Sequence, residues 1–342
     1  MGAGNLKAWN IGSSDFPRNG TAAEKARFAI AYAILAPSSH NTQPWRFVVV
    51  DDELLVCADR SRSLAVIDPF DRELIISCGA ALFNLRVVFS HFAIPIEITT
   101  FPQASDPDIL ARVVFPRSGS ISPDLGQLFD AMTLRVTNRS SFAAEPPPAD
   151  LVERVGSAAT AEGCDINLVQ SEKDRERVAA LVAEADRRQF SDPHFRRELA
   201  SWIHPSRSND GMPAYSQGVN PLVDASTPIV AMVIRTFDVG QGVAATHEAL
   251  ARGSPLIVVL STPRDNNESW LATGQALARV LLVVAASGFN ASYLNQPIEV
   301  PELRMRLAKV AKTARYPQLV LRIGRGPAVP HSPRRPLTDV LA

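Results

Sequence analysis

The stretch Ala36-Pro37-Ser38-Ser39-His40-Asn41-Thr42-Gln43-Pro44-Trp45-Arg46-Phe47 lies between a helix-like apolar run and a strongly β-prone run. Two prolines enclose small, hydroxyl-bearing and amide-bearing residues. This composition favours a turn of fixed shape with many hydrogen-bonding groups over a helix or a strand. The stretch therefore predicts a loop suited to the polar edge of a ligand.

The flanks of this loop mix helix and strand patterns. Thr21 and Glu24 form a capping box at the start of an apolar run that Pro37 ends, which predicts a helix. Residues 47–50 and 54–57 predict two short strands joined by a tight turn. A mostly apolar helix is expected over residues 74–92, followed by strands over 94–100 and 112–115.

Composition limits the classes of partner. Lys plus Arg and Asp plus Glu both total 35, so the chain has no overall positive field to attract nucleic acid or an anionic membrane. The late apolar stretch 276–289 is expected to be short for a membrane span, and no secretory segment is recognised, which favours a cytoplasmic protein. The three cysteines are far apart in the sequence, which argues against disulfides and a zinc site and predicts free thiols.

A basic segment follows a second helix signal. Ser122-Pro123 starts an apolar period of 3.6 residues that reaches Met132, and Arg135-Val136-Thr137-Asn138-Arg139 follows. The proline-rich stretch 142–150 is typical of a stiff connection. We therefore expect an N-terminal arm over 1–20, a first half over 21–141 and a second half over 142–342.

The second half contains a long polar connection. An amphipathic helix is expected over 171–190, after which residues 203–221 are polar and rich in glycine and proline. A connection of this length is either functional or mobile, so both a ligand-covering lid and a surface loop are open. Strands are expected over 229–234, 256–260 and 318–323, and a helix from about residue 269 that Gly288 ends.

The two halves share a weak internal repeat. At an offset of 195 residues (274 − 79), Gly79-Ala80-Ala81-Leu82 aligns with Gly274-Gln275-Ala276-Leu277. Each block is an apolar helix that leads into a strand. This similarity favours a duplicated fold.

The two motifs resemble those of a known family. The pattern Pro37-Ser38-Ser39-x-Asn41-x-Gln43-Pro44-Trp45-x-Phe47 resembles the loop of the nitroreductase-like flavoproteins, and Arg135-x-Thr137-x-Arg139 is similar to their Arg-x-Ser-x-Arg/Lys element. In that family two subunits build each flavin site, one supplying the loop and the other the basic element. Here each motif occurs once, with the loop first, whereas an ordinary copy has the basic element first.

A fused duplication explains this complementary loss. The chain resembles the Acg-type FMN-binding oxidoreductases from about residue 20 onward. The resemblance implies an α+β fold in which two nitroreductase-like halves, with central mixed or antiparallel sheets flanked by helices, mimic the nitroreductase homodimer. It also implies one FMN per chain.

Site residues follow from the chemistry of FMN. Its phosphate needs guanidinium and hydroxyl donors, for which Arg135, Thr137, Arg334 and Arg335 are candidates. By resemblance, Arg139 would face the pyrimidine edge, where a cation favours reduction. The resemblance further places a backbone N–H at the flavin N5, near Asn295 and Gln296. In the loop, Ser38, Ser39 and Asn41 would bond the ribityl hydroxyls and the polar edge of the ring. Pro37 and Gln43 are expected to hold the loop in shape rather than to touch the flavin.

Other residues have simpler interpretations. Trp45 and Phe47 are expected in the core, and His40 is expected to be a satisfied structural histidine. His204 and His247 have no partner recognisable in the sequence. No catalytic side chain and no metal site are expected, because the flavin carries the chemistry.

Two functions stay open. The first is an FMN oxidoreductase loaded by NAD(P)H that reduces small nitroaromatic or quinone-type acceptors. The alternative is FMN storage or sequestration, with the 203–221 segment closed over the flavin. The expected partners are small molecules rather than nucleic acid or membrane, and the chain is expected to be a monomeric pseudo-dimer or a weak homo-oligomer.

Overall fold

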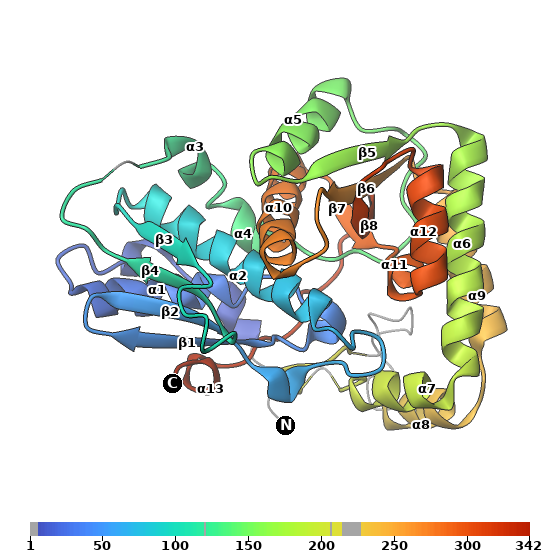
Figure 1. Cartoon of the computed structure of the whole chain (residues 1–342), viewed down its shortest axis with the longest axis horizontal. Coiled ribbons are helices and arrows are strands. Elements are labelled where there is room, and N and C mark those ends of the chain that lie inside the picture. Colours follow the sequence, from blue (N-terminus) through green and yellow to red (C-terminus); the bar gives the residue numbers. More distant parts are fainter. Residues whose placement is uncertain (1–5, 120, 206, 214–226) are drawn as a thin grey trace.

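The chain forms two four-stranded antiparallel sheets whose strands follow the same order (Figure 1). The computed structural model describes residues 6–119, 121–205, 207–213 and 227–342. In the first sheet the order is β1-β2-β4-β3 and in the second it is β5-β6-β8-β7. All neighbouring strands are antiparallel. The repeated order extends the weak sequence repeat to the whole topology.

The first half consists of α1 (Ala22–Ala33), β1 (Trp45–Val50), β2 (Glu53–Ala58), α2 (Arg72–His91), β3 (Glu97–Thr100) and β4 (Ile109–Val114). The predicted capping box starts α1, since Thr21 Oγ1 accepts from Glu24 N and Glu24 accepts from Thr21 N. The predicted β1–β2 hairpin is confirmed. Trp45 and Phe47 are fully buried in it, as expected for core residues.

The second half repeats this plan with two insertions. It contains α5 (Ala149–Thr160), β5 (Asp165–Val169), β6 (Leu256–Thr262), α10 (Asn267–Ala286), β7 (Asn290–Tyr293) and β8 (Tyr316–Gly324). Between β5 and β6, where the first half has only a tight turn, lie α6 (Glu172–Ser191), α7 (Pro193–Ser201), α8 (Thr227–Thr236) and α9 (Gly240–Arg252). Between β7 and β8 lie α11 (Gln296–Glu299) and α12 (Pro301–Val310). These insertions make the halves unequal around a shared core plan.

Two local predictions are wrong. Residues 229–234, expected as a strand, lie in α8, where Val230 and Ile234 share one helical face toward a cavity and Ala231 packs on the α7 cluster. Packing overrides the β propensity of this Ile- and Val-rich run. The single helix expected after Ser122 is instead two short helices, α3 (Pro123–Gly126) and α4 (Ala131–Leu134).

Helices α2 and α10 cross at the centre of the molecule, between the two sheets (Figure 1). Gly79 and Gly274, the pair aligned by the sequence repeat, meet at this crossing. A Cβ on Gly274 would lie 2.0 Å from Ile76 O and 2.7 Å from Gly79 Cα. Repeat-equivalent glycines that touch are expected where two related halves pack about a pseudo-twofold axis, so the crossing supports the duplication.

Helices α2 and α10 are also long and apolar enough to cross a membrane by length and composition, and α8 with α9 meets the same test only as a pair bent by 109°. The expectation that the late apolar run is too short is therefore wrong for α10, whose twenty residues start at Asn267. In this fold, most of the apolar window of each long helix is buried inside the protein, 83% for α2 and 61% for α10.

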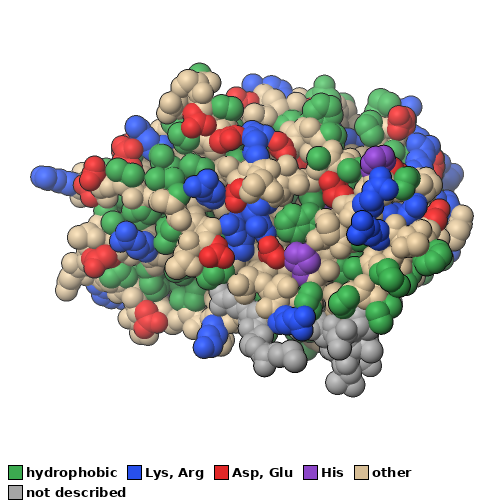
Figure 2. All heavy atoms as spheres, turned by 90° about the horizontal axis from the view of Figure 1, so that it is seen from below, with side chains coloured by type: hydrophobic (Ala, Val, Ile, Leu, Met, Phe, Trp, Pro, Cys, Tyr) green, Lys and Arg blue, Asp and Glu red, His purple; other side chains and the backbone are tan. Residues whose placement is uncertain are grey.

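The C-terminus returns to the first half, and Trp9 of the N-terminal arm packs on the C-terminal tail. Leu341, beyond α13 (Leu337–Val340), forms a parallel bridge with Phe47 of β1, and Ala342 N donates to Phe47 O. Near the other end, Trp9 Nε1 donates to Ser332 O and its ring stacks on His331 at 4.0 Å between centroids. On the surface, Figure 2 shows basic and acidic side chains interspersed, in line with the balanced charge.

Candidate functional site

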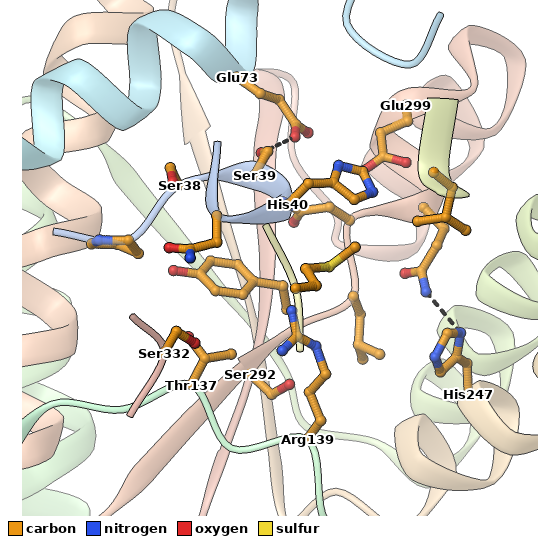
Figure 3. A pocket seen from close by; sticks show the side chains of 18 of the residues that line it. Ser38, Ser39, His40, Glu73, Thr137, Arg139, His247, Ser292, Glu299 and Ser332 are labelled. Atoms are coloured by element: carbon orange, nitrogen blue, oxygen red, sulfur yellow. Dashed lines mark hydrogen bonds between the residues drawn. The ribbon is translucent and has the colours of Figure 1, made fainter. Parts of the chain in front are cut away.

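A cavity of about 460 Å³ lies where the two halves meet (Figure 3). Its walls come from the loop before β1, the start of α2, the basic segment, the end of β7 with α11, and the C-terminal tail. Helices α6 to α9 supply apolar side chains on a further side. The volume lies within the usual range for a small-molecule or cofactor site.

The structure brings all but two of the predicted cofactor residues to this cavity. Gln43 and Arg335 do not line it. Gln43 Oε1 accepts from Arg335 N at 2.7 Å, and Arg335 Nη1 donates to Gln43 O at 2.9 Å, so the two brace each other behind the loop. The predicted residues that line the cavity are Pro37, Ser38, Ser39, Asn41, Arg135, Thr137, Arg139, Asn295, Gln296 and Arg334.

The loop has an unusual backbone held by long-range contacts. His40, Asn41 and Gln43 have φ values of 50°, 54° and 51°, in the left-handed region that costs energy for non-glycine residues. Ser38 Oγ accepts from Gln43 N at 2.9 Å across the turn. The Arg335 contacts fix the other side of Gln43. The loop therefore presents Ser38, Ser39 and His40 to the cavity in one defined shape (Figure 3).

One end of the cavity is cationic. Arg135 is buried, and its guanidinium donates to Leu35 O at 2.9 Å. Arg334 Nη1 donates to Asn41 Oδ1 at 3.1 Å, and both guanidiniums lie over the ring of Trp9, at 4.7 Å for Arg334 and 5.7 Å for Arg135. Burial lowers the pKa of Arg135, since desolvation disfavours its charged form. An anionic ligand group at this end would relieve that penalty.

Arg139 projects into the cavity from the opposite side to His40 (Figure 3). The side chain is reachable through the cavity, yet protein surrounds it, and this desolvation lowers its pKa. Its backbone is fixed by Arg322, which is fully buried and donates to Ser140 O at 2.9 Å and to Asn138 O at 3.2 Å. In the described part of the chain, neither Arg135 nor Arg139 has a carboxylate partner in an ion pair.

Three buried polar atoms beside the cavity have no hydrogen-bond partner within the described residues: His40 Nδ1, Tyr293 Oη and Gln296 Oε1. Burial, and after it the nearby Arg139 charge, lowers the pKa of His40 to about 4, so the ring is neutral near pH 7. The expectation of a satisfied histidine is therefore wrong. Buried polar groups normally have partners, so these atoms indicate a polar ligand.

The cavity also has an acidic side. Glu73, buried at the start of α2, accepts from Ser39 Oγ and pairs with Arg72 at 2.8 Å. Glu299 accepts from Gln189 Nε2 at 2.5 Å, and burial, followed by the Glu73 charge, raises its pKa to about 8. Glu299 is therefore largely protonated at neutral pH and can act as a hydrogen-bond donor.

The described part of the predicted lid is attached to the loop. Gly211 N donates to Asn41 O at 3.2 Å, Asn41 Nδ2 donates back to Gly211 O at 2.9 Å, and Gln43 Nε2 donates to Asn209 O at 2.9 Å. Met212 lines the cavity. Within the 203–221 segment, residues 206 and 214–221 lie outside the described residues.

Several lining residues were not predicted. Trp9 lies in an arm without periodicity, Tyr293 ends a short strand, and Glu73 starts an apolar helix, so none has a local signal for a ligand site. His247 pairs with Asp186, which is 61 positions away in the sequence. The order of these residues in the sequence does not reveal that they meet.

Comparison with known proteins gives the family. No family model matches the chain. The chain is 31% identical to "Putative NAD(P)H nitroreductase Rv3131" of Mycobacterium tuberculosis over 93% of its own length and 91% of the relative's. It is 30% identical to "Putative NAD(P)H nitroreductase acg" of the same organism, over 91% and 93%. The chain belongs to the acg family of putative NAD(P)H nitroreductases.

More distant members and structures are also found. "Probable NAD(P)H nitroreductase PigM" of a Serratia strain is 24% identical over 94% of both chains. Among solved structures, an FMN- and NADPH-dependent nitroreductase, NfnB, from sphigopyxis sp. matches 63% of this chain and 97% of its own, at 15% identity and a TM-score of 0.42. The expected resemblance to the acg family is confirmed. The expected α+β fold with two nitroreductase-like halves is also confirmed, since both sheets share one strand order.

Proposed function

We propose that this member of the acg family is an FMN-dependent oxidoreductase whose cavity between the two halves binds one FMN. The observation that carries the proposal is the meeting of the Pro37–Phe47 loop and the Arg135–Arg139 segment at one cavity. Arg135 and Arg139 have no carboxylate ion-pair partner in the described chain, and three buried polar atoms at the cavity have no hydrogen-bond partner there. A polar, anionic and partly apolar ligand such as FMN fits these needs.

Specific residues match specific parts of FMN. Arg135 and Arg334, with Thr137 and Ser332 beside them, suit the terminal phosphate, since guanidinium forks bind phosphate through charge-assisted bonds. Arg139 would face the pyrimidine edge, where its charge stabilises a more negative ring. Ser38, at the start of the loop, would bond the ribityl or ring edge. FMN would supply the electron transfer, while these residues bind it, orient it and tune its electrostatics.

The proposed reductant is NAD(P)H, and the proposed acceptors are nitroaromatic or quinone-type small molecules. The names of the relatives, which specify NAD(P)H and nitroreductase, support this assignment. The apolar wall formed by residues such as Phe195, Met212 and Ile234 suits a flat apolar acceptor. The chain is proposed to act as a cytoplasmic pseudo-dimer, with no nucleic acid or membrane required. Among the described residues there is no cluster of ligands for a metal ion.

FMN storage is a second candidate, favoured by one observation. The 207–213 segment is tied to the loop by reciprocal Asn41–Gly211 hydrogen bonds, and Met212 reaches the cavity. A segment held in this way could keep an acceptor away from the flavin.

The test is to purify the protein, measure its FMN content and follow bleaching of the flavin under anaerobic conditions with NADH or NADPH. Rapid bleaching followed by reoxidation with an added quinone supports turnover and excludes pure storage. Reduction by dithionite but by neither nicotinamide supports storage. A protein that binds no FMN contradicts both functions.

A further inference from the structure

The wall of the cavity formed by α6, α9 and α11 carries a polar group that the FMN proposal does not use. His247 of α9 lines the cavity beside Gln296 of α11 (Figure 3). Its Nδ1 lies 2.9 Å from Oδ2 of Asp186 on α6, which packs alongside α9. These residues come from the insertion between β5 and β6 and from the one between β7 and β8, so they have no counterpart in the first half.

Asp186 fixes the protonation pattern of the ring. Its side chain is only 2% exposed, and His247 is its single described hydrogen-bond partner. An ionised carboxylate can only accept hydrogen bonds, so Asp186 places the hydrogen of the neutral ring on Nδ1. The side-chain Nε2 of Gln296 also lies 3.0 Å from Nδ1, and a half-turn of this amide, which exchanges Nε2 with the unpartnered Oε1, makes that contact compatible with Nδ1–H. A buried carboxylate that holds a histidine in this way sets both the tautomer and the orientation of the ring.

The other ring nitrogen is available to a ligand. In the described part of the chain His247 Nε2 has no hydrogen-bond partner, and the side chain is 31% exposed, while the residue lines the cavity. Gln296 Oε1 nearby is also without a partner in that part. Apolar side chains line the same wall of the cavity: Phe190, Val243 and Leu250.

We propose that His247, oriented by Asp186, is the catalytic residue that gives a proton to the acceptor as it is reduced. This inference rests on the proposed function, which supplies the reductant. It assigns to the cavity a second region, built by the inserted helices, for an acceptor with a carbonyl-type or nitro-type oxygen.

The step balances for a quinone. Conversion to a hydroquinone needs two electrons and two protons. The bound cofactor, once reduced by NAD(P)H, would supply both electrons and one proton as a hydride equivalent. The Nε2–H bond of the protonated ring breaks, an O–H bond forms on the acceptor, and the ring is left neutral with Nδ1–H still donating to Asp186.

Other groups at the cavity suit this role less well. His40, which faces Arg139, has its pKa lowered to about 4 by burial and by that charge, so it holds no proton to donate near pH 7. Glu299 can donate a proton, but it already accepts from Gln189 at 2.5 Å and has no ion-pair partner among the described residues to orient it. His247 alone among these three combines a carboxylate that orients it with an unbonded ring nitrogen in the described chain.

The first test compares two acceptors with FMN-loaded His247→Gln. Reduced protein is mixed in stopped flow with a quinone, which must be protonated, or with ferricyanide, which takes electrons without a proton. We expect reoxidation by the quinone to slow by about 100-fold or more and reoxidation by ferricyanide to match the wild type. Exposed His194, outside the cavity, gives the control His194→Gln, which should match the wild type with both acceptors. An unchanged quinone rate, or equal slowing with both acceptors, would overturn the inference.

The second test does not depend on turnover. In protein labelled with ¹⁵N-histidine, the ring signals of His247 should report the Nδ1–H tautomer in the neutral state, and Asp186→Asn should lose this preference. An Nε2–H tautomer in the wild type would refute the role of Asp186. If FMN titration shows no binding, the proposed function fails by that measurement, whereas the tautomer result judges the dyad separately.

Discussion

The crossing of α2 and α10 gives a sharp prediction, because its close approach depends on Gly274. A Cβ there would lie 2.0 Å from Ile76 O, whereas ordinary contacts begin at 3.4 Å, so the shortfall is 1.4 Å (3.4 − 2.0). The contacting atoms are backbone, and no side chain can rotate away. The helices must separate, and overpacking of this kind costs about 1–3 kcal/mol. We expect Gly274→Ala to lower the free energy of unfolding by about 3 kcal/mol, near the upper end of this range.

The assay is urea unfolding of the FMN-free protein, followed by far-UV circular dichroism and tryptophan fluorescence. Gly156, inside α5, is the matched control, because its added Cβ would meet Ile166 Cγ2 at an ordinary 3.7 Å. Gly156→Ala should therefore stabilise the protein by about 0.5–1 kcal/mol through helix propensity. The same substitution should thus lower the free energy of unfolding at Gly274 and raise it at Gly156.

A double variant sharpens the test. A Cβ on Gly79 would lie 2.3 Å from Leu271 O at the same crossing. Once one alanine has separated the helices, the second should cost less, so the double variant should lose less stability than the sum of the single losses. If Gly274→Ala unfolds at the same urea concentration as the wild type or a higher one, the close helix crossing is refuted.

The remaining predictions concern the cavity. Arg135→Ala should weaken FMN binding about 10- to 150-fold in a fluorescence titration, because a charge-assisted bond is worth about 1.5–3 kcal/mol, whereas Arg112→Ala on the first sheet should have no effect. Burial raises the pKa of Glu299 from 4.5 to about 8, so the contribution of Glu299 to stability is full below about pH 4.5, falls as the pH rises and is lost above 8. Glu299→Gln should therefore remove this part of the pH dependence of the urea midpoint. Identical profiles of the midpoint against pH for the variant and the wild type would contradict the prediction. Gly211 has φ +73°, and a Cβ there would lie 2.5 Å from the His204 ring. Gly211→Ala should therefore displace the 207–213 segment and speed the release of FMN, measured by stopped flow. An unchanged release rate would show that this segment does not retain FMN.

Local sequence patterns predicted much of the fold. The capping box at Thr21 and the β1–β2 hairpin depend on residues close in the sequence, and the structure confirms both. The failure at α8 has the opposite cause. Residues 229–234 have β propensity, but packing against α7 and the cavity makes them helical. Propensity is a weak signal wherever long-range packing decides the element.

The candidate site divides in the same way. Pro37–Phe47 and Arg135–Arg139 could be recognised because each is a short pattern with fixed spacing. Gln43 was expected to hold the loop in shape, and its bonds to Arg335 agree with this. Arg335, a candidate for the phosphate, could not be assigned to the same role, since only the docked C-terminal tail brings it behind the loop. The wall that carries Asp186 and His247 was missed because helices α6 and α9 meet only in the folded chain.

The sequence by itself determined one loop motif and one basic segment, because spacing encodes local geometry, and it indicated two related halves through a weak repeat and a family resemblance. The tertiary structure alone decided that these motifs share one cavity, that Gly79 touches Gly274, and that a histidine and a buried aspartate face the cavity from the inserted helices. The physical reason is that a binding site depends on side chains brought together over long sequence separations. Such contacts follow from how the two halves pack, and no short segment of the sequence predicts them.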